Sequence, residues 1–112
     1  MIRLSKRAYS LLGLACNAGK AVSGYTAVSD MLSKGRAVLL LFAADTAENT
    51  VKNYVLQAER ENIGYYTVDD PDLCACVGHP ERKVLALNDI GFSREIIKEI
   101  NTLNVGVISS NE

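Results

Sequence analysis

Apolar positions along the chain follow two periodicities, one typical of amphipathic helices and one typical of buried strands. Between residues 8 and 15 the apolar side chains recur at positions i, i+3, i+4 and i+7, which predicts a first helix that Ser5 can cap and Gly19 can end. Residues 38–43 contain no polar side chain, and such a run predicts a strand that is buried on both faces. We therefore expect helices on both sides of a central sheet.

The first half of the chain alternates strands with helices. Residues 21–23 predict a short strand, and a turn at Gly24 leads from it into a helix over about 26–34. After the buried strand, Asp45 and Glu48 have the spacing of a capping box, which predicts the start of a third helix.

The second half continues this alternation. Strands are predicted over 65–68 and 83–87, with a short helix over 73–77 between them. Ser93 is placed to cap a last helix, whose isoleucines at 96, 97 and 100 share one face. Strands that alternate with helices of about ten residues predict the α/β class, as a three-layer α/β/α sandwich with a central mixed sheet.

The length of 112 residues suits one domain with one core. We expect an α/β/α domain over residues 1–101 and a C-terminal extension over 102–112. Within the extension, residues 105–108 have the apolar character of an edge strand, and the polar residues 109–112 are expected to fray.

Composition and charge narrow the functions that this chain can carry. Hydrophobic residues make up 48% and charged residues 22%, which is the balance of a globular protein and not of a disordered tail. The net charge is -1 and the isoelectric point is near 5.8, so the whole molecule has no basic field that would attract phosphates over long range. Any nucleic-acid binding must therefore come from a local patch.

Cysteine content and apolar runs bear on the compartment. The chain has 3 cysteines, an odd number that favours reduced thiols over a disulfide framework and so favours the cytosol. Residues 1–16 imitate a lipoprotein leader, but the apolar stretch is short and is interrupted by Tyr9 and Ser10, so we assign it to the fold. No apolar run approaches the ~18 residues of a membrane span, so we expect a cytoplasmic protein without a membrane partner.

Three constellations resemble sites of chemistry, and each is incomplete. Residues 13–20 resemble a phosphate-binding loop, yet the glycines are too far apart, Ala21 replaces the hydroxyl that would hold magnesium, and the segment follows a helix. Cys74, Cys76 and His79 could begin a metal site but lack a fourth ligand. The carboxylates at 69, 70 and 72 fit a turn and a helix start, and no nucleophile motif accompanies the single histidine. We expect no metal, cofactor or catalytic residue, which favours a binding protein over an enzyme.

Several short motifs stand in a familiar order, namely LGLA at 12–15, AGK at 18–20, VSG at 22–24, AAD at 43–45, NT at 49–50, residues 73–78 and DIGF at 89–92. In this order the chain resembles the ribosomal kink-turn-binding protein superfamily, the L-seven-Ae-like proteins, in its small bacterial YlxQ-type branch. The resemblance spans about residues 8–100. It implies an α/β/α sandwich and a non-catalytic protein that binds structured RNA or associates with the ribosome.

The resemblance also implies an RNA site built from two loops, the glycine turn before the second helix and the loop after residues 73–78. The start of a helix exposes amides that can hold phosphate oxygens, which agrees with this placement. The residues that we assign to the site are Lys20, Ser23, Gly24, Tyr25, Thr26, Lys34 and Arg82. Arg36 and Lys83 are further cations that could neutralise phosphates. Tyr25 either stacks on an unpaired base or fills the surface of the sheet.

Two hypotheses remain, because the residues that read bases in the family are not all present. In the family, a polar and acidic pair follows the turn glycine and a lysine comes one helical turn later; here these positions hold Thr26, Ala27 and Asp30. Alanine accepts no hydrogen bond from a base, and an aspartate repels phosphate. The first hypothesis is binding of structured RNA, with ribosomal RNA and ribosomal or translation proteins as candidate partners. The alternative is a protein-interaction module on the same fold with a degenerate RNA site.

Overall fold

A four-stranded mixed sheet forms the centre of the computed structural model, which describes residues 1–104. The strands are β1 (Ala21–Ser23), β2 (Leu39–Phe42), β3 (Gly64–Thr67) and β4 (Val84–Leu87), in the order β1-β4-β2-β3. Strand β4 runs antiparallel to both β1 and β2, whereas β2 and β3 are parallel. The mixed sheet predicted from the sequence is confirmed.

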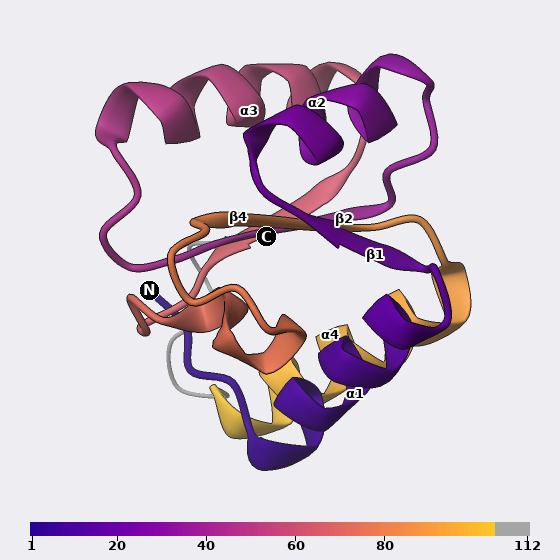
Figure 1. The fold of residues 1–112 in the computed structure, drawn as a ribbon, viewed down its shortest axis with the longest axis vertical. Helices are drawn as coiled ribbons and strands as arrows, with labels where there is room; N and C mark the ends of the chain where they lie inside the picture. The colour runs from indigo at the N-terminus through magenta and orange to yellow at the C-terminus, as the bar shows by residue number, and fades with distance from the viewer. Residues whose placement is uncertain (105–112) are drawn as a thin grey trace.

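Helices cover both faces of this sheet and complete three layers (Figure 1). The helices α2 (Tyr25–Ser33) and α3 (Glu48–Arg60) lie on one face. The helices α1 (Lys6–Asn17) and α4 (Ile90–Leu103), with the short 3-10 helix η1 (Leu73–Val77), lie on the other. The α/β/α sandwich expected from the alternation of strands and helices is therefore the observed architecture.

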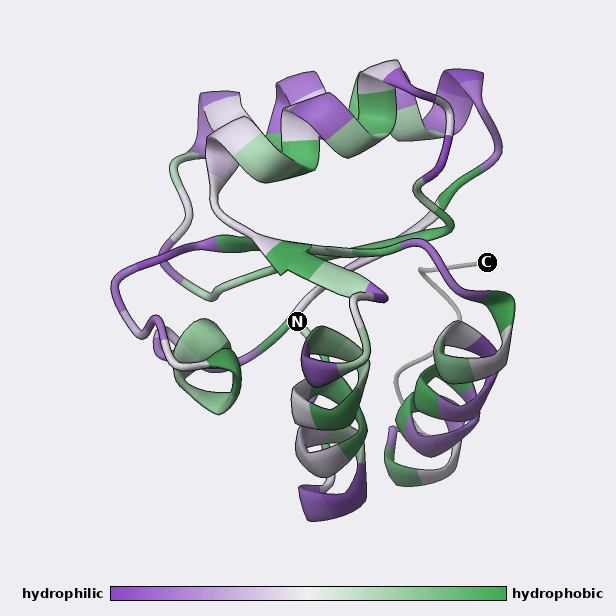
Figure 2. Cartoon of the chain, turned by 45° about the vertical axis from the view of Figure 1, so that its right-hand side comes forward, coloured by the Kyte–Doolittle hydropathy of each residue, from purple (hydrophilic) through white to green (hydrophobic). Residues whose placement is uncertain are grey.

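The core is divided into two parts by the sheet, because successive residues of a strand point to opposite faces. In β2, Leu39 and Leu41 pack with the α1 and α4 side, whereas Leu40 and Phe42 pack with the α2 and α3 side. All four of these side chains are fully buried. Figure 2 shows the matching pattern on the helices, whose apolar faces turn toward the sheet and whose polar faces turn away from it. Burial on both faces explains the uninterrupted apolar run in the sequence.

Helix α4 begins earlier than the sequence predicted. Its cap is Asp89, whose carboxylate accepts a hydrogen bond from the Phe92 amide at 2.8 Å. The prediction that Ser93 caps this helix is wrong, since Ser93 lies inside the first turns with only 4% of its surface exposed. Aspartate and serine are both favourable N-cap residues, and the helix begins after Asp89, which comes first in the sequence.

The capping box predicted for α3 is also wrong. The helix is capped by Ala47, which offers no side-chain acceptor. The Asp45 carboxylate, which the sequence pattern predicted as the cap, instead lies 3.0 Å from the ammonium of Lys83 and forms an ion pair with it. For α1, by contrast, the predicted cap is confirmed, because the Ser5 hydroxyl accepts from the Ala8 amide at 3.1 Å.

The C-terminal end of α4 is joined to the start of the chain. The helix runs two residues past the predicted boundary at 101, and the Asn104 side chain then accepts from the Arg3 amide at 2.9 Å and donates to the Arg3 carbonyl at 2.8 Å. The predicted edge strand at 105–108 and the fraying at 109–112 lie outside the described residues. No helix within residues 1–104 combines the length and the apolar character that crossing a membrane requires.

Candidate nucleic-acid interface

The turn between β1 and α2 leaves the first amides of α2 without a side-chain cap. Gly24 joins the two elements at φ 91° and ψ 156°, a conformation that is essentially restricted to glycine. Its amide donates to the Val84 carbonyl at 2.9 Å, which fixes the turn against β4. The first hydrogen bond along the helix runs from the Val28 amide to the Gly24 carbonyl, so the amides of residues 25–27 point outward from the helix start. Such amides are suited to bind an anion.

Arg82 lies directly over this turn. A Cβ placed on Gly24 would stand 3.2 Å from the Arg82 Cδ. The absence of a Cβ at Gly24 therefore lets the Arg82 side chain approach the turn. The Arg82 Nη1 group donates to the Ser23 hydroxyl at 3.0 Å and to the Ser23 carbonyl at 3.3 Å. The Arg82 side chain keeps 39% of its surface exposed. We call Ser23, Gly24, Tyr25, Thr26 and Arg82 the Gly24 corner.

Carboxylates accompany the cations around the Gly24 corner. Glu81 lies 3.8 Å from the Arg82 Nε and 3.6 Å from the His79 Nδ1. Lys83 is engaged twice, by Asp45 at 3.0 Å and by the Pro71 carbonyl at 2.9 Å. The Glu81 carboxylate is 69% exposed, so its pairs contribute little energy and a phosphate can compete with them, whereas the Lys83 side chain is only 25% exposed and is held by its two partners. Arg82 is the cation whose side chain lies against Gly24, at the start of α2.

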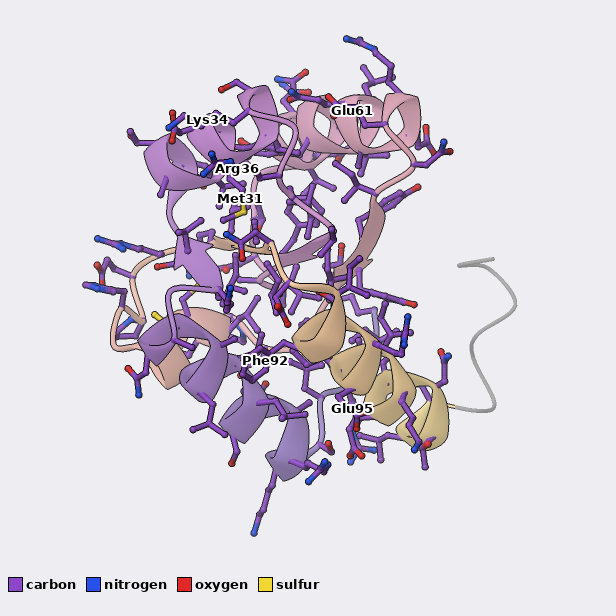
Figure 3. All side chains as sticks on the ribbon, turned by 90° about the vertical axis from the view of Figure 1, so that its right-hand side faces the viewer. Met31, Lys34, Arg36, Glu61, Phe92 and Glu95 are labelled. Atoms are coloured by element: carbon purple, nitrogen blue, oxygen red, sulfur yellow. The ribbon has the colours of Figure 1, made fainter. Side chains whose placement is uncertain are left out.

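The structure gathers five of the seven predicted site residues at the Gly24 corner, and it places the other two elsewhere. Lys34 follows α2, whose nine residues span about 13 Å, and its ammonium pairs with Asp30 at 3.1 Å. Figure 3 shows Lys34 beside Arg36 at the far end of that helix. Lys20 precedes β1, at the opposite end of the strand from Ser23. Lys20 and Lys34 are thus separated from the corner by the lengths of β1 and α2.

The positions that the resemblance associates with base reading lie on the first turns of α2. Thr26 is exposed and Ala27 is half-buried. The Asp30 side chain is 60% exposed and holds Lys34. The helix therefore presents one hydroxyl, one methyl group and one carboxylate at these positions.

The second loop of the implied site follows η1, a short helix that contains two of the three cysteines. Burial raises the pKa of the Cys74 thiol to about 12 and that of the Cys76 thiol to about 11, so both thiols stay protonated at neutral pH. Cys74 is fully buried, and its sulfur donates to the Val84 carbonyl at 3.8 Å. Within residues 1–104 no cluster of three His, Cys, Asp or Glu side chains is placed to hold a metal ion.

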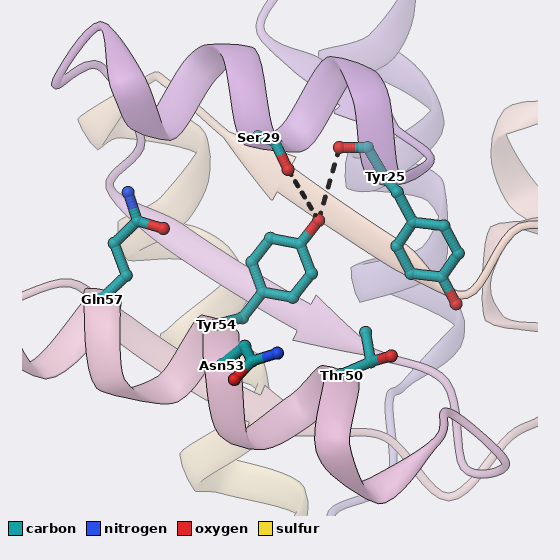
Figure 4. A pocket seen from close by; sticks show the side chains of 6 residues that line it. All are labelled: Tyr25, Ser29, Thr50, Asn53, Tyr54 and Gln57. Atoms are coloured by element: carbon teal, nitrogen blue, oxygen red, sulfur yellow. Dashed lines mark hydrogen bonds between the residues drawn. The ribbon is translucent and has the colours of Figure 1, made fainter.

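A pocket of about 300 Å³ between α2 and α3 was not anticipated from the sequence. Its lining comprises Tyr25 and Ser29 from α2 and Thr50, Asn53, Tyr54 and Gln57 from α3 (Figure 4). Tyr25 keeps 48% of its surface exposed and turns its ring toward α3, so the alternative that this ring fills the sheet surface is wrong. A signal is present in the sequence, because positions 50, 53, 54 and 57 follow helical spacing. That spacing alone does not show which neighbouring element these side chains meet.

Comparison with known sequences identifies relatives over most of the chain. Residues 6–97 match the family described as Ribosomal protein L7Ae/L30e/S12e/Gadd45. The RNA-binding protein YlxQ of Bacillus subtilis (strain 168) is 32% identical over 90 residues, which cover 80% of this chain and 90% of that protein. The RNA-binding protein YlxQ of Enterococcus faecium is 28% identical over 96 residues, covering 80% of this chain and 87% of that protein.

Solved structures share the same fold. A protein with unknown function from Bacillus halodurans C superposes with a TM-score of 0.79 at 26% identity, covering 87% of this chain and 99% of that one. The 15.5kD RNA binding protein of Giardia lamblia superposes with a TM-score of 0.64 at 11% identity, covering 92% of each chain. At that identity the second likeness concerns the fold alone.

Proposed function

The chain belongs to the ribosomal protein L7Ae/L30e/S12e/Gadd45 family, and from this premise we infer that it is a non-catalytic RNA-binding protein whose Gly24 corner holds the RNA backbone. The observation that carries the placement is the position of Arg82 over the uncapped start of α2. The Arg82 side chain and the uncapped first amides of α2 thus meet at the same glycine turn.

A phosphate at the Gly24 corner would accept hydrogen bonds from two kinds of donor. The first amides of α2 supply neutral donors together with the positive end of the helix dipole. Arg82 supplies a charge, and its Nη1 is already anchored on Ser23, so little side-chain freedom is lost when RNA binds. The molecule has little net charge to attract RNA over long range. The anchored arginine compensates for this by lowering the entropic cost of binding once the RNA backbone has reached the site.

We propose a structured RNA with a kink-turn, with ribosomal RNA as the source and the cytoplasm as the compartment. Ribosomal or translation proteins would then be neighbours on the same assembly. The relatives named RNA-binding protein YlxQ support RNA as the class of partner.

A salt-dependent titration tests this function. A fluorescently labelled kink-turn stem and a ribosomal RNA fragment are titrated with the wild type, Arg82→Ala and Lys98→Ala at a low and a higher salt concentration. We expect saturable binding at low salt, weakened by Arg82→Ala together with a decrease of about 1 in the salt slope. Lys98→Ala is the control, because it removes an equal charge from an exposed position on α4, on the other side of the sheet. It should leave binding unchanged. Absence of saturable binding to both RNAs at low salt contradicts the proposal.

Capture of partners with and without nuclease separates RNA binding from the protein-interaction alternative. If RNA mediates the contacts, captured partners disappear after nuclease treatment. Partners that persist after the RNA is destroyed would favour the protein-interaction module.

A further inference from the structure

A second pocket lies along one face of α4. Its volume is about 300 Å³, and we call it the α4 site; it is lined by Val38, Ile90, Ser93, Arg94 and Ile97. The four lining residues from α4 follow the i, i+3, i+4 and i+7 spacing of a single helical face. Val38 precedes β2 and supplies the opposite wall. The site is thus built by one helix packed beside the start of a strand.

The α4 site is separate from the Gly24 corner. Ser23, the last residue of β1, pairs with Leu85, which also pairs with Leu41 near the end of β2. Val38 lies just before the other end of β2. In addition, α4 covers the face of the sheet that α2 does not (Figure 1). A ligand at the α4 site therefore occupies a different part of the molecule from RNA at the Gly24 corner.

Aliphatic side chains form the walls of the α4 site. Ile90 is 62% exposed, and Val38 and Ile97 are half-buried. A hydrocarbon group that covers these side chains removes apolar surface from water, which favours binding. The volume of about 300 Å³ lies at the lower end of the range for small-molecule pockets. The walls therefore suit a short aliphatic chain.

The Ser93 hydroxyl is buried without a partner. Ser93 has 4% of its surface exposed, and its side-chain oxygen makes no hydrogen bond within residues 1–104. A serine inside a helix usually faces solvent or donates to the carbonyl one turn earlier, and Ser93 does neither. A hydroxyl can turn between staggered positions about the Cα–Cβ bond. Because Ser93 lines the α4 site, an acceptor held there can supply the missing partner.

Arg94 gives the α4 site a positive charge that no carboxylate neutralises. Among the described residues its guanidinium has no ion pair and no hydrogen bond, whereas the adjacent Glu95 is paired with Arg7 at 3.6 Å. Arg94 is exposed, so the guanidinium is free to turn toward a ligand. Its parallel N–H groups match the two oxygens of a carboxylate, which carries the single charge needed to balance one arginine.

We propose that the α4 site binds a short aliphatic carboxylate, whose acid group pairs with Arg94 and accepts a hydrogen bond from Ser93. The hydrocarbon chain then covers the aliphatic walls. A backbone phosphate offers a charge without a chain, and a plain hydrocarbon offers a chain without a charge, so neither matches all three features of the site. This binding activity goes beyond RNA binding and uses no residue of the Gly24 corner.

A titration with small acids tests the proposal on the whole chain. Nitrogen-15-labelled protein is titrated with hexanoate, butanoate and hexanamide, and amide shifts are followed along α4. Each buried methylene strengthens binding about 4-fold, so hexanoate should bind on the order of 10-fold more tightly than butanoate. Hexanamide has the same shape without the charge and should bind on the order of 10- to 100-fold more weakly than hexanoate. The shifts should be saturable and should fall on residues 38 and 90–97.

Variants of the lining residues assign the contacts. Arg94→Gln should weaken hexanoate on the order of 10- to 100-fold and change hexanamide little, because only the acid uses the charge. Ser93→Ala should weaken hexanoate about 5-fold without a loss of stability, since the hydroxyl has no partner in the free protein. Ile90→Asp places a carboxylate in the site and should abolish binding of hexanoate. Ile90 and Arg94 are exposed, so these variants should fold, which circular dichroism checks.

Lys98→Ala is the matched control, because Lys98 is an exposed cation on the same helix that does not line the site. It should bind hexanoate as the wild type does. The proposal is overturned if hexanoate gives no saturable shifts along α4, if hexanamide binds as tightly as hexanoate, or if Lys98→Ala weakens binding as much as Arg94→Gln. Arg94→Gln should bind a labelled kink-turn stem like the wild type, so failure of the RNA proposal and failure of this one are observed separately.

Discussion

Replacing Gly24 by alanine tests the structural basis of the RNA site through two separate effects. The first concerns the backbone, since φ 91° with ψ 156° is a region that costs residues other than glycine about 1–3 kcal/mol. The second concerns Arg82, because the new methyl group would stand 3.2 Å from its Cδ and displace the side chain. Loss of the Arg82 hydrogen bonds to Ser23 adds about 1 kcal/mol. We therefore expect Gly24→Ala to lower the free energy of unfolding by about 2–4 kcal/mol.

Gly35→Ala is the matched control for the backbone effect. Gly35 has φ 66°, and a methyl group at this position would meet nothing within 4 Å apart from its two neighbours in the chain, so the substitution strains the backbone without pushing on a distant side chain. We expect it to cost about 1–2 kcal/mol and to leave RNA affinity unchanged. Urea unfolding followed by far-ultraviolet circular dichroism gives the stabilities, and titration of a labelled kink-turn stem gives the affinities. The reasoning is refuted if Gly24→Ala is as stable as the wild type, or if both variants bind RNA equally well.

Four further substitutions test individual side chains. Asp30→Lys should raise kink-turn affinity in a titration while changing stability little, because the exposed pair of Asp30 with Lys34 contributes little energy; unchanged affinity would mean that RNA does not approach this side of α2. Asp89→Ala should lower the free energy of unfolding by about 1 kcal/mol through loss of the α4 cap. Ser93→Ala removes a buried hydroxyl without a partner among the described residues, so the free energy of unfolding should stay the same or rise. If urea unfolding shows that Asp89→Ala and Ser93→Ala lose the same stability, both expectations are contradicted. Burial raises the pKa of the Cys74 thiol from 9.0 to about 12, so the folded chain keeps a proton that the unfolded chain releases; the free energy of unfolding should fall as the pH rises above 9, and the fall should shrink in Cys74→Ala.

The fold was largely predictable because its main determinants are local and periodic. The run at residues 38–43 specified a strand buried on both faces, and the apolar stripe of the first helix specified which side faces the sheet. The errors concern helix starts, where several capping residues compete within a few positions. Asp45 pairs with Lys83, which lies 38 positions later in the sequence, and no local spacing reveals that pairing. Asp89 and Ser93 were both suitable caps, and only the observed start of α4 decides between them.

The site was predictable only in part, since it depends on contacts between distant segments. Gly24 stood out because a glycine between a strand and a helix indicates a special turn. The contact of Arg82 with Ser23 joins residues 59 positions apart, and composition gave no reason to prefer this cation over Lys20 or Lys34. The pocket was missed because the polar face of an amphipathic helix does not reveal which neighbour it meets. The packing of α2 beside α3 is what turns that face into a lining.

Mapping backbone amides by nuclear magnetic resonance tests most directly whether RNA settles at the start of α2. A nitrogen-15-labelled protein is titrated with the kink-turn stem, and the amide shifts are recorded along the chain. We predict that the largest changes fall on residues 24–27 and on the Arg82 side-chain Nε–H, with the amides of α1 and α4 little affected. Changes concentrated on α1 and α4, with the signals of Gly24 and Arg82 unmoved in a saturated complex, would contradict the account.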